Sequence, residues 1–134
     1  MNSPAAYRIV SVDDDFVVSR LIATILAAGG YTVESATSSE EALTAIAPWD
    51  TVDLLVTDYS MPALNGLELL EKARSRGFRG KVLVFAAAIP QHAWEQAAEL
   101  RVQRIIEKPG SAGELLASVR ALLTGPARGA AKVA

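Results

Sequence analysis

Residues 52–58 read Val-Asp-Leu-Leu-Val-Thr-Asp, an apolar run of strand length that ends in a carboxylate. Such a run is typical of a strand buried on both faces of a parallel sheet, because the covering helices leave neither face open to water. We therefore expect a central strand over residues 52–57, with Asp58 placed directly after it.

The same alternation extends along the chain in both directions from this strand. Apolar runs of strand length are separated by segments whose apolar residues recur every three or four positions, as on one face of a helix. Five strand-then-helix repeats favour an α/β fold, a doubly wound five-stranded parallel sheet with five helices. The four other strands are expected at residues 7–12, 31–36, 82–86 and 104–107.

Start and stop signals delimit the expected helices. A Ser or Asn followed three residues later by Glu predicts a capping box at three helix starts. Gly29-Gly30 ends the first helix and Pro48 the second, and Pro90 suits the first turn of the fourth. The capping pairs are Ser38 with Glu41, Asn65 with Glu68, and Ser111 with Glu114. The first helix has an apolar stripe of Val17, Val18, Leu21, Ile22, Ile25 and Leu26.

Length and composition indicate one globular domain, expected over residues 7–124, followed by a flexible tail over 125–134. The 134 residues are 51% hydrophobic and 21% charged, with a net charge of −2. That charge does not favour nucleic acid as a partner. The absence of cysteine excludes disulfides and thiolate zinc sites, and no apolar run approaches the ~20 residues of a membrane span. We expect a soluble, cytoplasmic protein.

Acidic residues follow two of the expected strands. Asp13, Asp14 and Asp15 come after the first strand, and Asp58 after the third. Because the carboxyl ends of parallel strands share one edge of the sheet, several carboxylates should converge there if the two strands are neighbours. Their mutual repulsion requires either retained protons or a divalent cation, and an all-oxygen ligand set suits Mg²⁺.

Lys108 follows the fifth strand and should reach the same edge. Acids, a lysine and a divalent ion suit phosphoryl transfer, in which catalysis is mostly positioning and neutralisation of charge. An ionised Asp58 could be the nucleophile and form an aspartyl-phosphate. An Asp after a strand is more often a turn or capping residue, and we interpret Asp15 in that way, as the N-cap of the first helix.

This ordered set of residues resembles the receiver domain of two-component response regulators, over residues 9–123. The family carries an acidic pair, then an acceptor Asp followed by Met-Pro and Gly, and finally Lys-Pro. The matching residues are Asp13-Asp14, Asp58, Met61-Pro62, Gly66 and Lys108-Pro109.

The resemblance implies a fold and a set of roles. The fold would be flavodoxin-like, with strand order 2-1-3-4-5. Asp14, Asp58 and the backbone carbonyl of Ser60 would bind Mg²⁺, and Asp13 would act through water. Lys108 would pair with the phosphoryl oxygens. The peptide bond from Lys108 to the next residue, a proline, would be cis.

Two positions depart from the family pattern. Ala86 stands where the family has Ser or Thr, and Ile105 stands where it has Tyr or Phe. A hydroxyl bonded to a charged group contributes roughly 1.5–3 kcal/mol, whereas reversing a switch from 1:99 to 99:1 takes about 5.5 kcal/mol. Our hypothesis is that phosphorylation occurs without the hydroxyl–aromatic relay. The signal would then leave through the 59–64 loop, the fourth helix or a dimer contact. A one-residue slip of the alignment near Phe85 is the alternative.

The expected function is that of a single-domain response regulator and not of an enzyme acting on other molecules. It would accept a phosphoryl group from a histidine kinase or phosphotransfer protein and signal by contact with a downstream protein, possible homodimers included. A phosphorylation-independent pseudo-receiver is the alternative. An aspartyl-phosphate phosphatase ranks lower, because its general acid should stand at position 60, which is Ser. His92 is interpreted as a surface residue, and Trp94 as either core or a partner-facing anchor.

Overall fold

A computed structural model of the chain describes residues 7–108 and 110–124. Within these residues, five parallel strands alternate with five helices, and the sheet order is β2-β1-β3-β4-β5. This confirms the expected doubly wound sheet and its order. The strands are β1 Arg8–Val12, β2 Thr32–Ala36, β3 Leu54–Thr57, β4 Lys81–Ala86 and β5 Arg104–Glu107. The helices are α1 Phe16–Ala28, α2 Ser39–Ile46, α3 Gly66–Ser75, α4 Gln91–Glu99 and α5 Ala112–Leu122.

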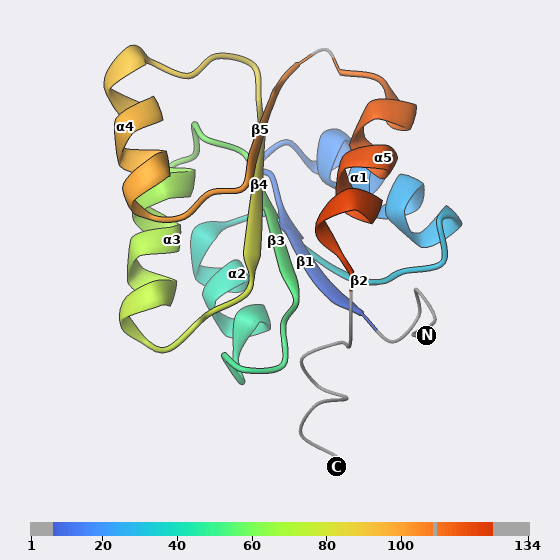
Figure 1. Ribbon diagram of the computed structural model, residues 1–134, viewed down its shortest axis with the longest axis horizontal. Coiled ribbons are helices and arrows are strands. Elements are labelled where there is room, and N and C mark those ends of the chain that lie inside the picture. Colours follow the sequence, from blue (N-terminus) through green and yellow to red (C-terminus); the bar gives the residue numbers. More distant parts are fainter. Residues whose placement is uncertain (1–6, 109, 125–134) are drawn as a thin grey trace.

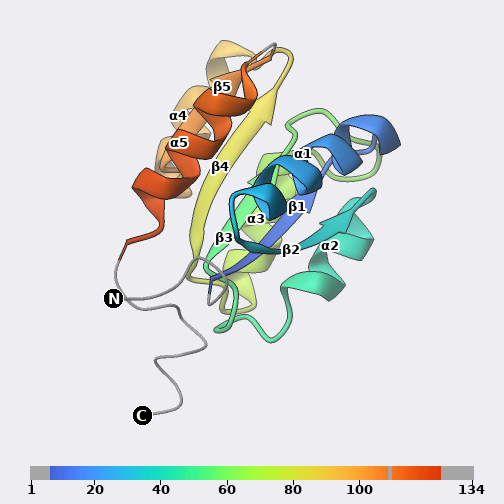
Figure 2. The same cartoon turned by 90° about the vertical axis from the view of Figure 1, so that its right-hand side faces the viewer.

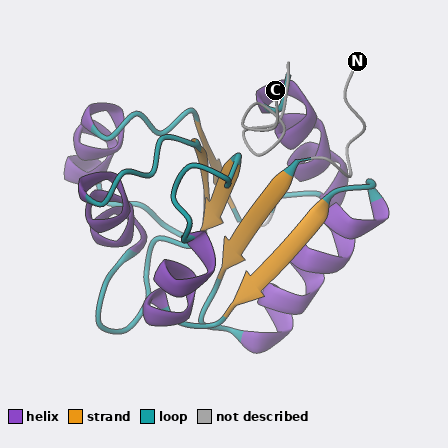
Figure 3. Cartoon of the chain, turned by 90° about the horizontal axis from the view of Figure 1, so that it is seen from below, coloured by secondary structure: helices purple, strands orange, loops and turns teal. Residues whose placement is uncertain are grey.

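The helices cover the sheet in two layers (Figure 1). α2, α3 and α4 lie on one face, and α1 and α5 lie on the other, in front of the strands in Figure 2. Viewed from below, the strands lie between these two layers (Figure 3). Alternate residues of one strand therefore enter different cores. Val84 and Ala86 belong to the cluster beneath α2, α3 and α4, whereas Leu83 and Phe85 belong to the cluster beneath α1 and α5.

The central strand is buried as its sequence predicts. All four residues of β3 are buried, between β1 on one side and β4 on the other. A strand with neighbours on both edges and helices on both faces has no contact with water, which explains its uninterrupted apolar sequence.

The helix starts follow the capping signals, but of the three predicted capping boxes only the one at α3 is complete. The Asn65 and Glu68 pair forms a complete capping box. Ser38 and Ser111 each accept the expected backbone N–H three residues on. Glu41, however, accepts hydrogen bonds from the backbone and side chain of Thr37 in place of the N–H of Ser38. Pro90 is the N-cap of α4, one residue before the expected position.

The apolar stripe of the first helix is only partly buried. Ile22 and Leu26 are buried, but Val17 is 72% exposed and Leu21 is 56% exposed, beside an exposed Phe16. Periodicity marks the apolar side of a helix, but the width that the sheet can cover is narrower than this stripe.

Several expectations fall on or reach undescribed residues. The tail at 125–134 and the residue after Lys108, whose peptide bond we expected to be cis, lie outside the described residues. Among the described residues, the helices are all too short or too polar to cross a membrane.

Candidate functional site

The carboxyl ends of three strands carry the candidate site, at the top of the sheet in Figure 1. Backbone hydrogen bonds extend the pairing of β3 with β1, and of β5 with β4, by one residue beyond the carboxyl end of each strand. The N–H of Asp58 donates to Val12, and the N–H of Lys108 donates to Ala86. The three chain segments after β1, β3 and β5 are therefore fixed at the same edge, and their side chains meet there.

Asp13, Asp14 and Asp58 form the acidic cluster of this site. One carboxylate oxygen from each side chain lies within 4.8 Å of the other two. Two ionised carboxylates at that separation repel by roughly 3–4 kcal/mol at an effective dielectric of 20. The cluster therefore stores unfavourable energy that a hard divalent cation would relieve.

Lys108 supplies the opposite charge. Its Nζ lies 2.8 Å from Oδ2 of Asp13 and 4.0 Å from Oδ1 of Asp58. One ammonium group facing three carboxylates leaves the cluster negative. The side chain of Asp13 is 2% exposed, so its ion pair with Lys108 is shielded from solvent and from salt.

Each acid has a different set of protein donors. Asp13 also accepts the N–H of Asp15 through Oδ1, so both of its oxygens are engaged. Asp58 accepts the N–H of Tyr59 at 2.8 Å. Asp14 is exposed. Asp15, as expected, is the N-cap of α1, with its carboxylate accepting from Val17 and Val18.

Burial is the main reason that the pKa of Asp58 is raised above its ordinary value of 3.8. The negative charge of Asp13 raises this pKa further, and the exposed Asp14 adds a smaller contribution of the same sign. The ammonium of Lys108 and the N–H of Tyr59 oppose the rise without cancelling it. Neutralising the two neighbouring acids would therefore favour the ionised, nucleophilic form of Asp58.

The loop from Asp58 to α3 depends on a glycine. A Cβ built on Gly66 would stand 2.1 Å from the carbonyl oxygen of Asp58, a distance that no side chain tolerates. The N–H of Gly66 donates to Tyr59 at 2.7 Å and closes the loop. Gly66 is thus required on steric grounds, since the start of α3 packs directly onto the backbone of Asp58.

The two atypical positions contribute to the core on the α2–α3–α4 face of the sheet. Ala86 ends β4, is 1% exposed, and shares a buried cluster with Ala93 and Ala97 of α4. Ile105 is partly buried against the same cluster. Thr57 has a hydroxyl near the site, but this residue is fully buried and the hydroxyl donates to the backbone carbonyl of Asp58.

Three features of the site were not predicted from the sequence. The first is the ring of Phe85 beneath the ammonium of Lys108. The second is the contact of Gly66 with Asp58, and the third is the exposed apolar patch of Phe16, Val17 and Leu21 on α1. For the first feature, the available signal in the sequence was an aromatic residue next to the atypical Ala86. Strand alternation alone does not predict that the ring of Phe85 lies beneath Lys108.

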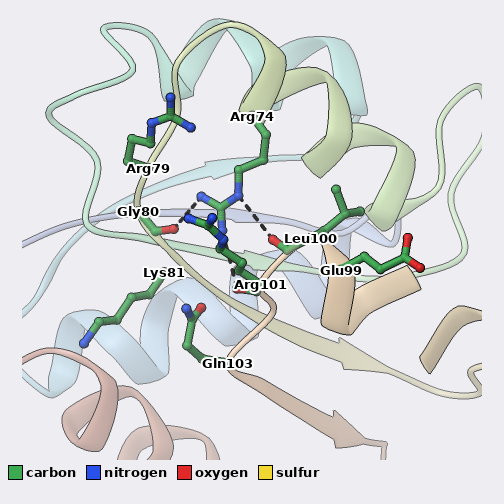
Figure 4. A pocket seen from close by; sticks show the side chains of 8 residues that line it. All are labelled: Arg74, Arg79, Gly80, Lys81, Glu99, Leu100, Arg101 and Gln103. Atoms are coloured by element: carbon green, nitrogen blue, oxygen red, sulfur yellow. Dashed lines mark hydrogen bonds between the residues drawn. The ribbon is translucent and has the colours of Figure 1, made fainter. Parts of the chain in front are cut away.

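A cavity of about 400 Å³ lies at the opposite end of the sheet, between the end of α3, the start of β4 and the α4–β5 connection (Figure 4). Its lining is basic, but its central arginine is engaged by the protein. Arg74 donates to the backbone carbonyls of Phe78, Gly80 and Leu100, and to that of Arg101 at a longer 3.5 Å. We therefore interpret the residues around this cavity as structural, because Arg74 connects the end of α3 to the α3–β4 and α4–β5 connections.

The other residues singled out in the sequence lie away from the acidic cluster. His92 is exposed on α4, as expected. Trp94 on the same helix is 44% exposed, which favours the partner-facing alternative over core packing.

Comparison with protein families and curated proteins gives a consistent result. The family model of the response regulator receiver domain matches residues 9–120. The chain is 38% identical over 116 residues to the response regulator MprA of Mycobacterium leprae, and 40% identical over 116 residues to that of Mycobacterium ulcerans. Each alignment covers 87% of this chain and 50% of the relative. The chain thus spans half the length of these relatives.

Solved structures show the same likeness. A CheY-like receiver domain protein from Methanospirillum hungatei is 27% identical, with a TM-score of 0.78 over 86% of this chain and 91% of that one. The non-phosphorylated receiver domain of HemR from Leptospira biflexa is 28% identical, with a TM-score of 0.80 over 90% of this chain and 98% of that one.

Proposed function

We propose that this chain, which belongs to the response regulator receiver domain family of two-component signalling, accepts a phosphoryl group on Asp58 in a reaction that needs Mg²⁺. The observation that carries the proposal is the convergence of three carboxylates and one ammonium group at the carboxyl edge of the sheet. Membership of the family implies a histidine kinase or a phosphotransfer protein as the donor.

The residues of the cluster fit a magnesium site. Carboxylates are the hard oxygen ligands that Mg²⁺ prefers, and the ion would offset the negative charge around the acceptor. Asp14, Asp58 and the backbone carbonyl of Ser60 would hold the ion directly. Asp13 would act through water, since both of its oxygens already accept protein hydrogen bonds.

The chemistry assigned to this chain is a single displacement at phosphorus. An oxygen of ionised Asp58 forms the new O–P bond while the P–N bond to the donor imidazole breaks, and the imidazole leaves with the bonding pair. The ammonium of Lys108 would form an ion pair with the transferred phosphoryl oxygens, since its Nζ already lies 4.0 Å from Oδ1 of Asp58. The protein acts on its own side chain and has no turnover on other phosphate esters.

Labelling by acetyl phosphate tests this proposal. The native protein should gain one phosphoryl group in the presence of Mg²⁺ and none in its absence, and Asp58→Ala should gain none. Glu107→Gln, which removes an exposed acid at the end of β5, is the matched control and should be labelled like the native protein. Equal labelling of Asp58→Ala and native protein would reject Asp58 as the acceptor, and an unlabelled native protein would favour the pseudo-receiver alternative.

The donor protein would dock on the apolar patch of α1, which consists of Phe16, Val17 and Leu21. These side chains are 62%, 72% and 56% exposed, and the first of them directly follows the acidic segment Asp13–Asp15 after β1. Clustered exposed apolar residues mark protein interaction sites, and this patch is beside the acceptor that a donor must reach.

Comparison of two phosphoryl donors, a phosphohistidine protein and acetyl phosphate, separates an effect on docking from an effect on the chemical step. Leu21→Ser should slow transfer from the cognate phosphohistidine protein by roughly tenfold, in line with an interface contact of about 1.4 kcal/mol, and should leave labelling by acetyl phosphate unchanged. Ala27→Ser, at the exposed far end of the same helix, should change neither rate. If Leu21→Ser slows both donors equally, the patch has another role.

The output of the phosphorylated protein would not use a hydroxyl–aromatic relay, because Ala86 and Ile105 supply neither group. The signal would leave through the loop after Asp58, through α4 or through a dimer contact, and would end in binding of a downstream protein. A beryllofluoride complex tests this point. The β4–α4 loop should move less in the native complex than in the Ala86→Ser complex, and equal inward movement in both would contradict the proposal.

A further inference from the structure

Phe85 occupies an unusual place beside the site. It is the penultimate residue of β4, and its side chain lies on the face of the sheet opposite to that of Ala86, in the cluster beneath α1 and α5. It is nearly buried, with 9% of its surface exposed. The ring therefore has one stable position, which the surrounding core defines.

Lys108 reaches the acids across this ring. Its Nζ lies 5.5 Å from the centroid of the Phe85 ring, within the range of a cation–π interaction. The same Nζ is 2.8 Å from Asp13 and 4.0 Å from Asp58. The negative face of the ring is thus a third partner for the ammonium, and unlike the carboxylates it cannot gain or lose charge.

Gly110 gives an independent indication that the ring position is specific. A Cβ built on Gly110 would stand 3.0 Å from Cε1 of Phe85 and 2.9 Å from Cγ2 of Ile106. Any side chain at this position would therefore press on the ring. The absence of a side chain at Gly110, two residues after Lys108, thus leaves room for the ring of Phe85.

We propose that Phe85 is a positioning residue that holds the ammonium of Lys108 between Asp13 and Asp58, an inference that rests on the proposed phosphoryl transfer. A lysine has four rotatable side-chain bonds, and a fixed ring beneath its charged end restricts the conformations that it can adopt. The ring would thus keep Lys108 near the acceptor before the phosphoryl group arrives, and its effect would fall on the rate of transfer and not on Mg²⁺ binding.

Stepwise fluorination of the ring tests this proposal without removing the side chain. Phenylalanine analogues with one, two and three fluorines, placed at position 85, withdraw the negative charge of the ring face at nearly constant shape. The rate of labelling by acetyl phosphate should fall with each fluorine, to a total loss of roughly three- to tenfold, while Mg²⁺ affinity stays constant. The same series at Phe78, which is fully buried beneath the guanidinium of Arg74, should leave the rate unchanged.

A spectroscopic measurement reports the placement directly. The ε-methylene protons of Lys108 should show an upfield ring-current shift in the NMR spectrum of the native protein. Phe85→Tyr should keep this shift, and Phe85→Leu should lose it while retaining the fold. A labelling rate that is indifferent to fluorination, or ordinary ε-methylene shifts in the native protein, would overturn the proposal. Failure of the proposed function would differ, because the native protein itself would then not be labelled.

Discussion

The two ends of the sheet handle charge in opposite ways. At the carboxyl end, Asp13, Asp14 and Asp58 face a single ammonium group, so negative charge remains uncompensated. At the amino end, the guanidinium of Arg74 donates to backbone carbonyls of the α3–β4 and α4–β5 connections. One end of the molecule is thus arranged for a ligand and the other for stability.

Arg8 repeats the stabilising arrangement at the amino end. Its side chain donates to Thr51, Glu34 and the carbonyl of Ala45, and its backbone N–H donates to Asp53. These contacts connect the start of β1 to the end of α2 and to the segment that precedes β3. The guanidinium groups of Arg8 and Arg74 have their hydrogen-bond partners within the chain, whereas the acids at the other end are still attractive to a cation.

The largest effect should come from breaking the stabilising end. Arg74→Met should lower the free energy of unfolding by about 2–3 kcal/mol, because the charged donor to several carbonyls is lost. Urea denaturation measures this change. Labelling by acetyl phosphate should be unaffected in the folded variant, because the acidic cluster lies at the other end of the sheet.

Arg104→Met is the matched control for Arg74. Arg104 is half exposed and its ion pair with Glu114 is 3.6 Å long, so its removal should change the free energy of unfolding by less than about 1 kcal/mol. If the two variants lose equal stability, Arg74 is an ordinary surface cation and the contrast between the two ends disappears.

Removal of a ligand should weaken the carboxyl end toward Mg²⁺ without unfolding it. Asp14→Asn should lower Mg²⁺ affinity by about tenfold, or about 1.4 kcal/mol, as measured by calorimetry. Asp15→Asn should bind Mg²⁺ like the native protein, because Asp15 caps α1 and Asn is an equally good N-cap. An equal loss in both variants would mean that general negative charge, and not a defined ligand set, attracts the ion.

The smallest effect concerns the free energy of unfolding, which the ionised carboxylates of the acidic cluster lower. Because the pKa of Asp58 is raised on folding, its contribution to stability is present below the ordinary value of 3.8 and is lost as the pH rises through the raised value. Asp58→Asn should therefore be more stable than the native protein at neutral pH in the absence of Mg²⁺, by less than about 1 kcal/mol because the site is partly exposed.

Denaturation at several pH values in the presence of EDTA checks the sign. The advantage of Asp58→Asn should shrink toward zero as the pH falls below 3.8, where the native carboxyl is protonated in both states. A variant that is less stable than the native protein at neutral pH would show that the ion pair with Lys108 outweighs burial and repulsion.

Much of the fold could be predicted because the sequence pattern has a direct physical cause. The all-apolar run of β3 predicts burial on both faces, and the repeated alternation of strands and helices predicts a parallel sheet. The meeting of Asp13, Asp14 and Asp58 followed from topology, since parallel strands end at the same edge.

The features that could not be predicted depend on three-dimensional packing. The exposure of Val17 and Leu21 depends on how α1 packs against the sheet, which helical periodicity does not specify. The ring of Phe85 meets Lys108 only because β4 and β5 are neighbours with a particular register. The need for glycine at position 66 depends on how closely α3 approaches Asp58.

The most direct test of the contrast between the two ends is an NMR titration with Mn²⁺ as a paramagnetic substitute for Mg²⁺. We expect saturable broadening of the backbone signals of Asp13, Asp14 and Asp58, which excess Mg²⁺ reverses, while the signals of Gly80 and Arg101 at the opposite end stay sharp. Absence of saturable broadening at the three acids, or broadening of equal strength at both ends, would contradict a defined metal site beside the proposed phosphoryl acceptor.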